Sequence, residues 1–93
     1  VTNHTKQDLK GFTVLLAEDN KVNQIVARRF LENWGLEVLI AENGNEAFSK
    51  YIDNNVDLIL MDLQMPEMDG FTATAKIRQW NKDVPVLALT ASV

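Results

Sequence analysis

The sequence predicts an α/β domain built on a doubly wound parallel sheet, and three observations lead to this prediction. Short apolar runs of the kind that form buried strands alternate with longer stretches in which apolar residues recur every three or four positions. Polar turn residues separate the two kinds of segment. The chain has 93 residues, 46% hydrophobic and 24% charged, as expected for one globular domain. Alternating strands and helices imply right-handed crossovers and helices on both faces of the sheet.

The chain opens with a polar lead-in or linker, residues 1–11. The first strand is expected at Thr13–Ala17, a nearly unbroken apolar run typical of a strand covered on both faces. A helix follows, with Asp19 or Asn20 as its cap and Gly35 at its end. Its apolar residues recur every three or four positions, as on one face of a helix; they are Val22, Ile25, Val26, Phe30 and Trp34.

The second strand is expected at Leu36–Ala41, where alternating apolar residues indicate a strand near a sheet edge. A second helix follows the polar turn at residues 42–45 and ends at Asn54. Its inner face is expected to carry Ala47, Phe48, Tyr51 and Ile52. The third strand is expected at Val56–Met61 and leads directly into Asp62.

Asp69 can cap a third helix, and the fourth strand is expected at Val84–Leu89. The helix is predicted from an apolar stripe made by Gly70, Ala73, Ile77 and Trp80. Trp34 and Trp80 extend the inner faces of the helices that they end, so we expect both rings to pack. The predicted order of elements is therefore βαβαβαβ.

Carboxylates terminate two of the predicted strands: Glu18 and Asp19 follow the first, and Asp62 follows the third. Parallel strands end at one edge of the sheet, and ligands of open α/β sheets bind there, so the three acids are expected to converge. Like charges at short range raise a pKa or demand a cation, and Mg²⁺ prefers oxygen ligands in a pocket open to water. With such an ion bound, one carboxylate is free to attack a phosphoryl group, and Thr90 could donate a hydrogen bond to that group.

Composition narrows the classes of function. The chain has no cysteine, which excludes disulfides and thiolate metal sites. Its apolar runs fall far short of the about 20 residues that cross a bilayer. A net charge of -4 without clustered Lys or Arg argues against direct nucleic-acid binding. We expect a soluble, cytoplasmic chain with no membrane contact by this segment. No glycine-rich nucleotide loop is present, and Gln64 stands where aspartyl-phosphate phosphatases have the second acid of D-x-D.

Structural roles explain the remaining polar and sulfur-containing residues better than functional ones. Glu67 and Asp69 fit loop solvation and a helix cap better than metal ligation. His4 is the only histidine and lies in the polar lead-in, so we expect it to be solvated. The three methionines neighbour hard oxygen donors, which favours packing over a soft-metal site.

Three ordered segments, "VLLAEDN", "MDLQMPEMDG" and "PVLALTA", resemble the receiver domain of two-component response regulators and hybrid sensor histidine kinases. The resemblance covers residues 12–93, which are expected to be the N-terminal part of such a domain. It implies a flavodoxin-like sheet with strand order 2-1-3-4. It also implies that Asp62 accepts a phosphoryl group from the phosphohistidine of a histidine kinase or histidine phosphotransfer domain. Mg²⁺ would be held by Glu18, Asp19, Asp62 and the backbone carbonyl of Gln64.

The same resemblance makes Thr90 the hydroxyl that senses the phosphoryl group and Ala91 the small residue beside it. The domain would be no enzyme but a phosphoacceptor with self-phosphorylation and autodephosphorylation, and its parent would resemble a hybrid histidine kinase. Receiver domains continue through a fourth helix, a lysine-bearing fifth strand and a fifth helix, for which this chain has no counterpart before Val93. Lys76 and Lys82 stand too early to supply that lysine. The exposed fourth strand is expected to allow self-association, and an unswitched binding or assembly module is the alternative function.

Overall fold

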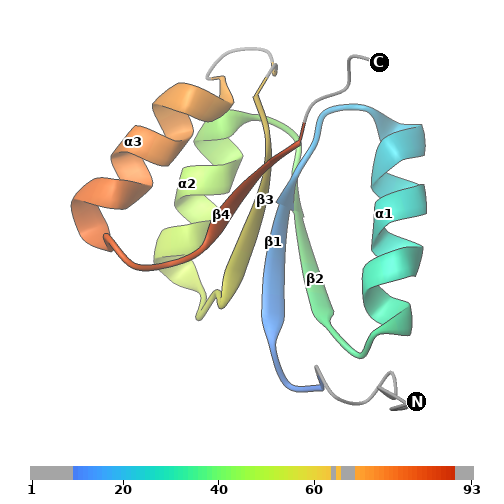
Figure 1. The fold of residues 1–93 in the computed structure, drawn as a ribbon. Coiled ribbons are helices and arrows are strands. Elements are labelled where there is room, and N and C mark those ends of the chain that lie inside the picture. Colours follow the sequence, from blue (N-terminus) through green and yellow to red (C-terminus); the bar gives the residue numbers. More distant parts are fainter. Residues whose placement is uncertain (1–9, 64, 66–68, 90–93) are drawn as a thin grey trace.

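The computed structural model describes residues 10–63, 65 and 69–89, which form one parallel sheet with helices on both faces (Figure 1). The elements are β1 (Thr13–Ala17), α1 (Lys21–Asn33), β2 (Glu37–Ala41), α2 (Gly44–Asp53), β3 (Leu58–Asp62), α3 (Gly70–Trp80) and β4 (Val86–Leu89). All three strand pairs are parallel, and the order across the sheet is β2-β1-β3-β4. The predicted fold class, element order and strand order are therefore confirmed.

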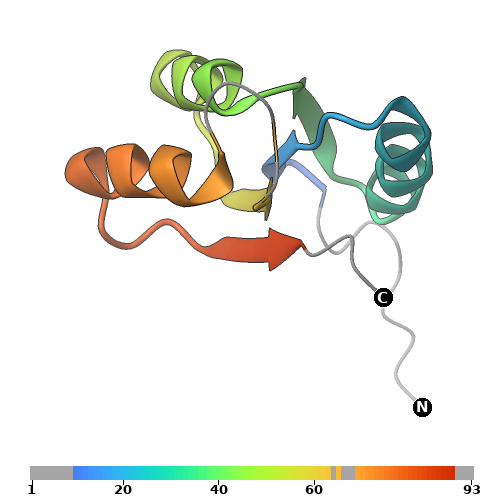
Figure 2. The ribbon, with the colours of Figure 1, turned by 90° about the horizontal axis from the view of Figure 1, so that it is seen from above.

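The chain winds in two directions from β1. Helix α1 leads from β1 to β2 on one face of the sheet, whereas α2 and α3 cover the opposite face and lead to β3 and β4 (Figures 1 and 2). The winding direction therefore reverses between β1 and β3, and the crevice at their carboxyl ends is where α/β sheets of this kind bind ligands. Within the described part of the chain, no helix combines the length and hydropathy needed to cross a bilayer.

Three polar side chains cap the three helices. The side chain of Asn20 accepts a hydrogen bond from the backbone N–H of Asn23 at 3.0 Å, and Asn43 and Asp69 cap α2 and α3 in the same way at 2.8 Å. Each cap satisfies a helical N–H that has no partner within its own helix. Because Asn20 rather than Asp19 caps α1, the carboxylate of Asp19 is left for other contacts.

Strand boundaries differ slightly from the predicted ones. The last turn before β2 includes Leu36, whose N–H donates to the carbonyl of Leu31, so the strand begins one residue later than predicted. The strand β3 runs to Asp62 itself, which makes this acid part of the sheet. The strand β4 begins at Val86, because Val84 instead bonds the side chains of Asn81 and Arg78.

The main core lies between the sheet and the pair α2 and α3. Strand residues Leu15, Ile59 and Met61 are fully buried and pack with Ala73 and Ile77. The predicted inner faces of α2 and α3 are confirmed apart from their last residues. Trp80 is 67% exposed and Ile52 is 39% exposed, so the prediction that Trp80 packs was wrong. Each of them lies in the last turn of its helix and lines a pocket that opens to solvent.

The helix α1 presents its apolar residues to solvent. Val22, Ile25, Val26 and Phe30 are 56–68% exposed, and Gln24 is the one buried residue of the helix. Trp34, which follows the helix, is 40% exposed. The helix was correctly predicted, but its apolar stripe does not face the sheet. Spacing alone gives the angle between two residues on a helix and not the direction in which the helix is docked.

Gly70 opens α3 in contact with the end of β3. Its N–H donates to the carbonyl of Leu63 at 3.3 Å. A Cβ on Gly70 would lie 2.3 Å from the backbone oxygen of Asp62, 2.8 Å from the Cα of Leu63 and 2.9 Å from the Cγ of Met61. Two of these three atoms belong to the backbone, so a side chain here would displace the strand end that carries Asp62.

We therefore predict that Gly70→Ala lowers the free energy of unfolding by about 1–3 kcal/mol, as overpacking of a close contact does. Urea unfolding followed by circular dichroism measures the change. Gln79→Ala, an exposed position in the same helix, should stay within about 0.5 kcal/mol of the parent. Equal stability of Gly70→Ala and the parent would show that α3 can move away from Asp62 without cost.

Candidate functional site

Three carboxylates meet at the carboxyl ends of β1 and β3. Glu18 and Asp19 follow β1 directly, and Asp62 is the last residue of β3. The two strands are neighbours, with Ala17 opposite Met61, so Glu18 lies next to Asp62. One oxygen from each of the three carboxylates lies within 4.8 Å of the others. The structure thus brings together the three acids that the sequence placed at strand ends.

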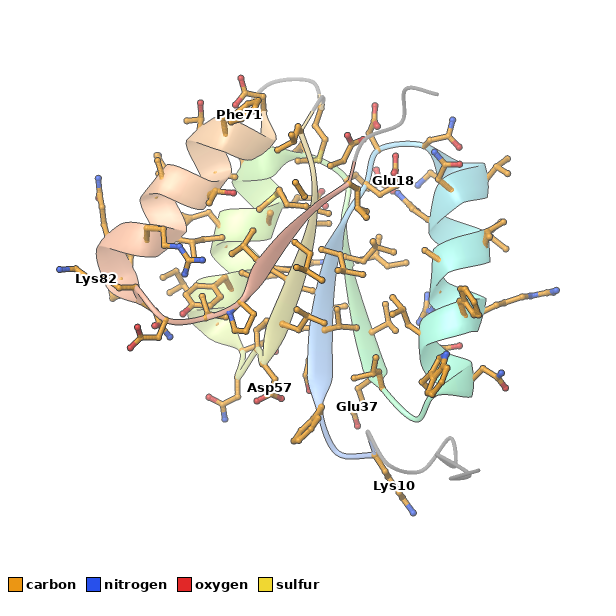
Figure 3. The ribbon with its side chains drawn as sticks, in the orientation of Figure 1. Lys10, Glu18, Glu37, Asp57, Phe71 and Lys82 are labelled. Carbon is orange, nitrogen blue, oxygen red and sulfur yellow. The ribbon has the colours of Figure 1, made fainter. Side chains whose placement is uncertain are left out.

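The three acids differ in their exposure. Glu18 is 5% exposed and Asp62 is 3% exposed, whereas Asp19 is open to solvent (Glu18 is labelled in Figure 3). Charged carboxylates are rarely this buried unless hydrogen bonds or a cation compensate them. The cluster therefore has a sheltered part, formed by Glu18 and Asp62, and an open part at Asp19 through which solvent reaches it.

Hydrogen bonds hold Glu18 at three of its atoms. Its N–H donates to the carbonyl of Ala41 in β2 at 2.9 Å. Its carboxylate oxygen Oε2 accepts from the backbone N–H of Asn20 at 3.0 Å. Its carbonyl oxygen accepts from Nε2 of Gln24 at 2.6 Å. Sequence reasoning missed Gln24, because a polar side chain opposite an apolar stripe is ordinarily expected to face solvent.

Burial raises the pKa of Glu18 above its ordinary value, because the charged form loses solvation. The hydrogen bond from Asn20 lowers the pKa, and the nearby negative charge of Asp62 raises it further. The net direction is upward, so ionised Glu18 is destabilised as long as nothing positive lies beside it. A site with these properties favours binding of a cation.

The donor set fits a hard divalent cation. All three side chains offer oxygen, and the chain has no cysteine that would favour a softer metal. Mg²⁺ binds oxygen at about 2.0–2.1 Å, so two direct ligands lie at most about 4.2 Å apart. A cluster within 4.8 Å therefore suits an ion that takes some carboxylates directly and others through water.

Gln64, Thr90 and Ala91, which were singled out from the sequence, fall outside the described residues. The two lysines considered in the sequence lie elsewhere. Lys76 stands over the ring of Phe48, with 5.6 Å from Nζ to the ring centroid. Lys82 follows α3 at the far end of the sheet from Glu18 (Figure 3). Neither lysine therefore lies at the acidic cluster.

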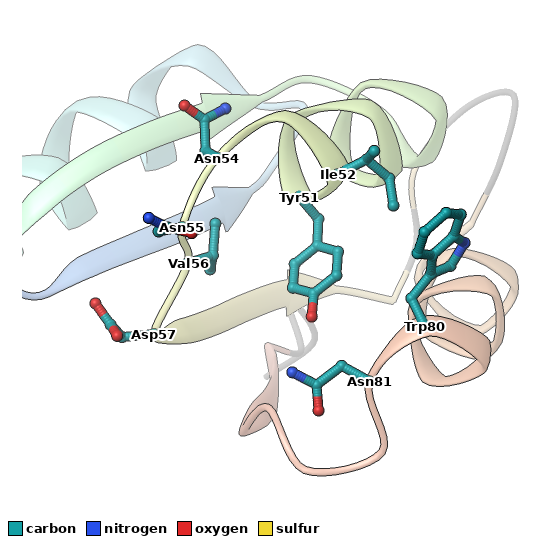
Figure 4. A pocket seen from close by; sticks show the side chains of 8 residues that line it. All are labelled: Tyr51, Ile52, Asn54, Asn55, Val56, Asp57, Trp80 and Asn81. Carbon is teal, nitrogen blue, oxygen red and sulfur yellow. The ribbon is translucent and has the colours of Figure 1, made fainter.

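A pocket of about 590 Å³ opens at the opposite end of the sheet (Figure 4). Its walls come from the end of α2, the segment that enters β3 and the end of α3, with the aromatic rings of Tyr51 and Trp80. Its single carboxylate, Asp57, already accepts a hydrogen bond from the N–H of Thr13 at 2.8 Å. The eight lining residues include no cationic side chain. This pocket thus offers no alternative to the acidic cluster as a metal or phosphoryl site.

Comparison with known proteins relates the chain to one family, both by a family model and by curated relatives. Residues 14–93 match the family model described as the response regulator receiver domain. The chain is 37% identical over 91 residues to the transcription factor SKN7 of Saccharomyces cerevisiae, which covers 98% of this chain and 15% of that protein. The chain thus spans less than a sixth of the length of that curated relative.

Solved structures agree in fold. One is the receiver domain of the sensor histidine kinase PA1611 from Pseudomonas aeruginosa, which has a magnesium ion coordinated in its active site cleft. Its TM-score is 0.84 and its sequence is 39% identical, and the match covers 88% of this chain and 69% of that one. The response regulator TrrA in complex with the histidine kinase ThkA gives a TM-score of 0.81 and 32% identity, over 88% and 71% of the two chains. Both levels of identity support a relationship beyond the fold alone.

The raised pKa of Glu18 leads to a prediction about stability. A folded state that binds a proton more tightly than the unfolded state is most stable below the ordinary glutamate pKa and loses stability as the pH rises through the raised value. In the absence of divalent ions, Glu18→Gln should therefore raise the free energy of unfolding at neutral pH by roughly 0.5–2 kcal/mol. The gain should vanish at acidic pH, where Glu18 is protonated. Urea titrations in EDTA, from acidic to neutral pH, measure the difference in the free energy of unfolding between Glu18→Gln and the parent.

The control is Glu37→Gln, because Glu37 is exposed and lies at the other end of the sheet (Figure 3). This variant should match the parent within about 0.5 kcal/mol at every pH. If Glu18→Gln also matched the parent throughout, burial of Glu18 would carry no cost in the metal-free chain.

Proposed function

The chain belongs to the family of response regulator receiver domains, and we propose that it is the phosphoacceptor of a two-component phosphorelay, with Asp62 as the acceptor. The observation that carries the proposal is the convergence of Glu18, Asp19 and Asp62 at the ends of two adjacent strands. Asp62 is part of strand β3, and Gly70 lies against its backbone. The backbone from which the carboxylate extends is therefore held in place. We assign residues 12–93 to this domain, in keeping with the family match over residues 14–93.

The proposed step moves a phosphoryl group from a phosphohistidine to Asp62. A carboxylate oxygen of Asp62 attacks phosphorus, an O–P bond forms and the P–N bond breaks. The electron pair of the P–N bond returns to the ring nitrogen, and the imidazole leaves neutral when its other nitrogen carries a proton. Asp62 is 3% exposed, so the acyl phosphate would form in a sheltered site with restricted access of water.

We propose that Glu18, Asp19 and Asp62 hold Mg²⁺ together with the backbone carbonyl of Gln64. The ion would supply positive charge to the phosphoryl oxygens and screen the repulsion between the acids. Glu18 contributes a fixed carboxylate, because Asn20 bonds its oxygen Oε2. Asp19 contributes a solvent-accessible one.

The remaining roles follow the family pattern. We propose that Thr90 donates its hydroxyl to the transferred phosphoryl group and that Ala91 leaves room beside it. The chain would act on itself, through self-phosphorylation and autodephosphorylation, and would turn over no separate substrate. As the parent protein we favour a cytoplasmic hybrid histidine kinase, since a sensor kinase receiver is among the similar structures.

The donor is proposed to be a histidine kinase or a histidine phosphotransfer domain. The complex of ThkA with TrrA provides a precedent for such a partner. A protein that presents its imidazole to Asp62 must also contact the elements around that edge of the sheet. The helix α1 begins at this edge, directly after the acid pair, and its exposed Val22, Ile25 and Val26 offer an apolar surface. We propose that the donor docks on these three residues.

A second candidate function is an unswitched assembly module. The strand β4 lies at the edge of the described sheet, and Leu87 in it is 55% exposed. Unpaired strand edges with apolar side chains recruit further strands or chains. Self-association through β4 is compatible with phosphorylation, so the two candidates are separated only by a test of chemistry at Asp62.

We predict that the chain gains one phosphoryl group from acetyl phosphate in the presence of Mg²⁺ and that Asp62→Asn abolishes this gain. The amide of asparagine is not a nucleophile toward phosphorus under these conditions. Intact mass spectrometry measures the gain. Asp57→Asn is the matched control, because Asp57 directly precedes the other end of the same strand, and this change should leave the gain unchanged. Magnesium binding without any phosphorylation of the parent would favour the assembly module.

Docking on α1 makes a separate prediction. Ile25→Lys should slow phosphoryl transfer from a phosphorylated histidine phosphotransfer domain by roughly tenfold, because it places a charge within an apolar contact. Phosphorylation by acetyl phosphate should not change, since this small donor needs no docking surface. Ile52→Lys, an exposed apolar position on α2, serves as the control for both reactions. Equal transfer to Ile25→Lys and the parent would place the docking surface elsewhere.

A further inference from the structure

The buried side chain of α1 is polar. Gln24 is 6% exposed, whereas the apolar residues around it on the helix, such as Ile25 and Val26, face solvent. A helix that only needed to pack on the sheet would bury apolar side chains there. Burial of an amide is costly unless its hydrogen bonds are made. The position of Gln24 thus requires an explanation other than packing.

The amide of Gln24 reaches into the loop that carries the acid pair. Its Nε2 donates to the carbonyl oxygen of Glu18 at 2.6 Å, in a buried contact six residues back along the chain. Its own N–H donates to the carbonyl of the cap residue Asn20 at 2.9 Å, which is the first bond of the helix. The contact that is specific to the glutamine is therefore the side-chain bond to Glu18, just before Asp19.

These contacts fix the loop relative to the rest of the sheet. The N–H of Glu18 is bonded to Ala41 in β2, and its carbonyl is bonded to Gln24 in α1. The backbone of Glu18 is thus held from two elements at once, and the direction in which its carboxylate leaves the chain is set. Asp19 comes next in the chain, so the same hydrogen bonds also hold the backbone from which the side chain of Asp19 extends.

We infer that Gln24 is a positioning residue of the acidic site, which sets the affinity for a divalent cation by holding the backbone between Glu18 and Asp19. The inference rests on the proposed function of that site as a Mg²⁺ site. Mg²⁺ requires near-ideal octahedral geometry, so small displacements of a ligand weaken binding. Groups that orient metal ligands without touching the ion commonly change affinity by about 10–100-fold when they are removed. Gln24 is placed to act in this way on two of the three acids.

The test compares the Mg²⁺ affinity of the 93-residue chain with that of Gln24→Met, by isothermal titration calorimetry. Methionine keeps the length and volume of the side chain but donates no N–H. We expect a loss of about tenfold in Mg²⁺ affinity. Asp19→Ala, which removes a proposed ligand, should lose at least as much and serves as the positive control. Gln24→Asn, whose amide is one methylene too short to reach Glu18, is the second variant if methionine disturbs folding.

A purely structural role would lower stability without changing the affinity of the folded chain. Arg78→Met controls for this, because the guanidinium of Arg78 donates to the carbonyl of Val84 at 2.6 Å, far from the acids. All titrations are done where urea curves show every variant folded. Arg78→Met should bind Mg²⁺ like the parent. If Gln24→Met also bound like the parent, or if Arg78→Met lost as much affinity, the role of Gln24 would be refuted.

Phosphorylation is measured on the same samples with acetyl phosphate. A parent chain that binds Mg²⁺ but gains no phosphoryl group would overturn the proposed function and leave the role of Gln24 in cation binding intact. Equal Mg²⁺ affinity of the parent and Gln24→Met would overturn the role of Gln24 and leave the phosphoacceptor proposal intact. A parent chain without Mg²⁺ affinity would overturn the cation site and Gln24's part in it together.

Discussion

The parallel pairing of β1 with β3 is the constraint on which the site depends. It places Ala17 opposite Met61, and the next residue of each strand is an acid, Glu18 or Asp62. Strand β2 is also followed by an acid, Glu42, but the carboxylate of Glu42 pairs with Lys21 and is not part of the cluster. The pairing joins segments more than 40 residues apart, through crossovers that pass over opposite faces of the sheet. Glu18 and Asp62 are sheltered at this edge of the sheet, and Asp19 keeps the cluster open to solvent.

Burial of two acids opposes stability, and the surrounding structure offsets only part of the cost. The N–H of Asn20 solvates Glu18, yet the pKa of Glu18 stays above its ordinary value because desolvation is the larger effect. Gly70 adds a second constraint, since the close approach of α3 leaves no room behind Asp62 for a side chain. The site is thus rigid and electrostatically unfavourable without a cation, as expected of a place that binds a divalent ion.

Two groups among the exposed apolar side chains of the described residues bear on how the domain meets other chains. One is the outer face of α1, with Val22, Ile25 and Val26, which begins beside the acids. The other is the edge at β4, where Leu87 is exposed. Their positions suggest different uses, because the first begins directly after the acid pair, whereas the second lies along the outer edge of the described sheet. The second is suited to strand pairing, whether within a longer chain or between chains.

The sequence by itself determined the element order, the strand order implied by its family resemblance, and the three acids of the site, because these depend on local periodicity and on the residue that ends each strand. It was also sufficient to identify Asp69 as a cap. Tertiary structure decided which face of α1 is buried, because helical spacing is the same for a stripe that faces the sheet and one that faces solvent. It decided that Asn20 rather than Asp19 caps α1, and that Gln24 bonds the carbonyl of Glu18, since a contact between a helix and the loop before it depends on how the helix is docked.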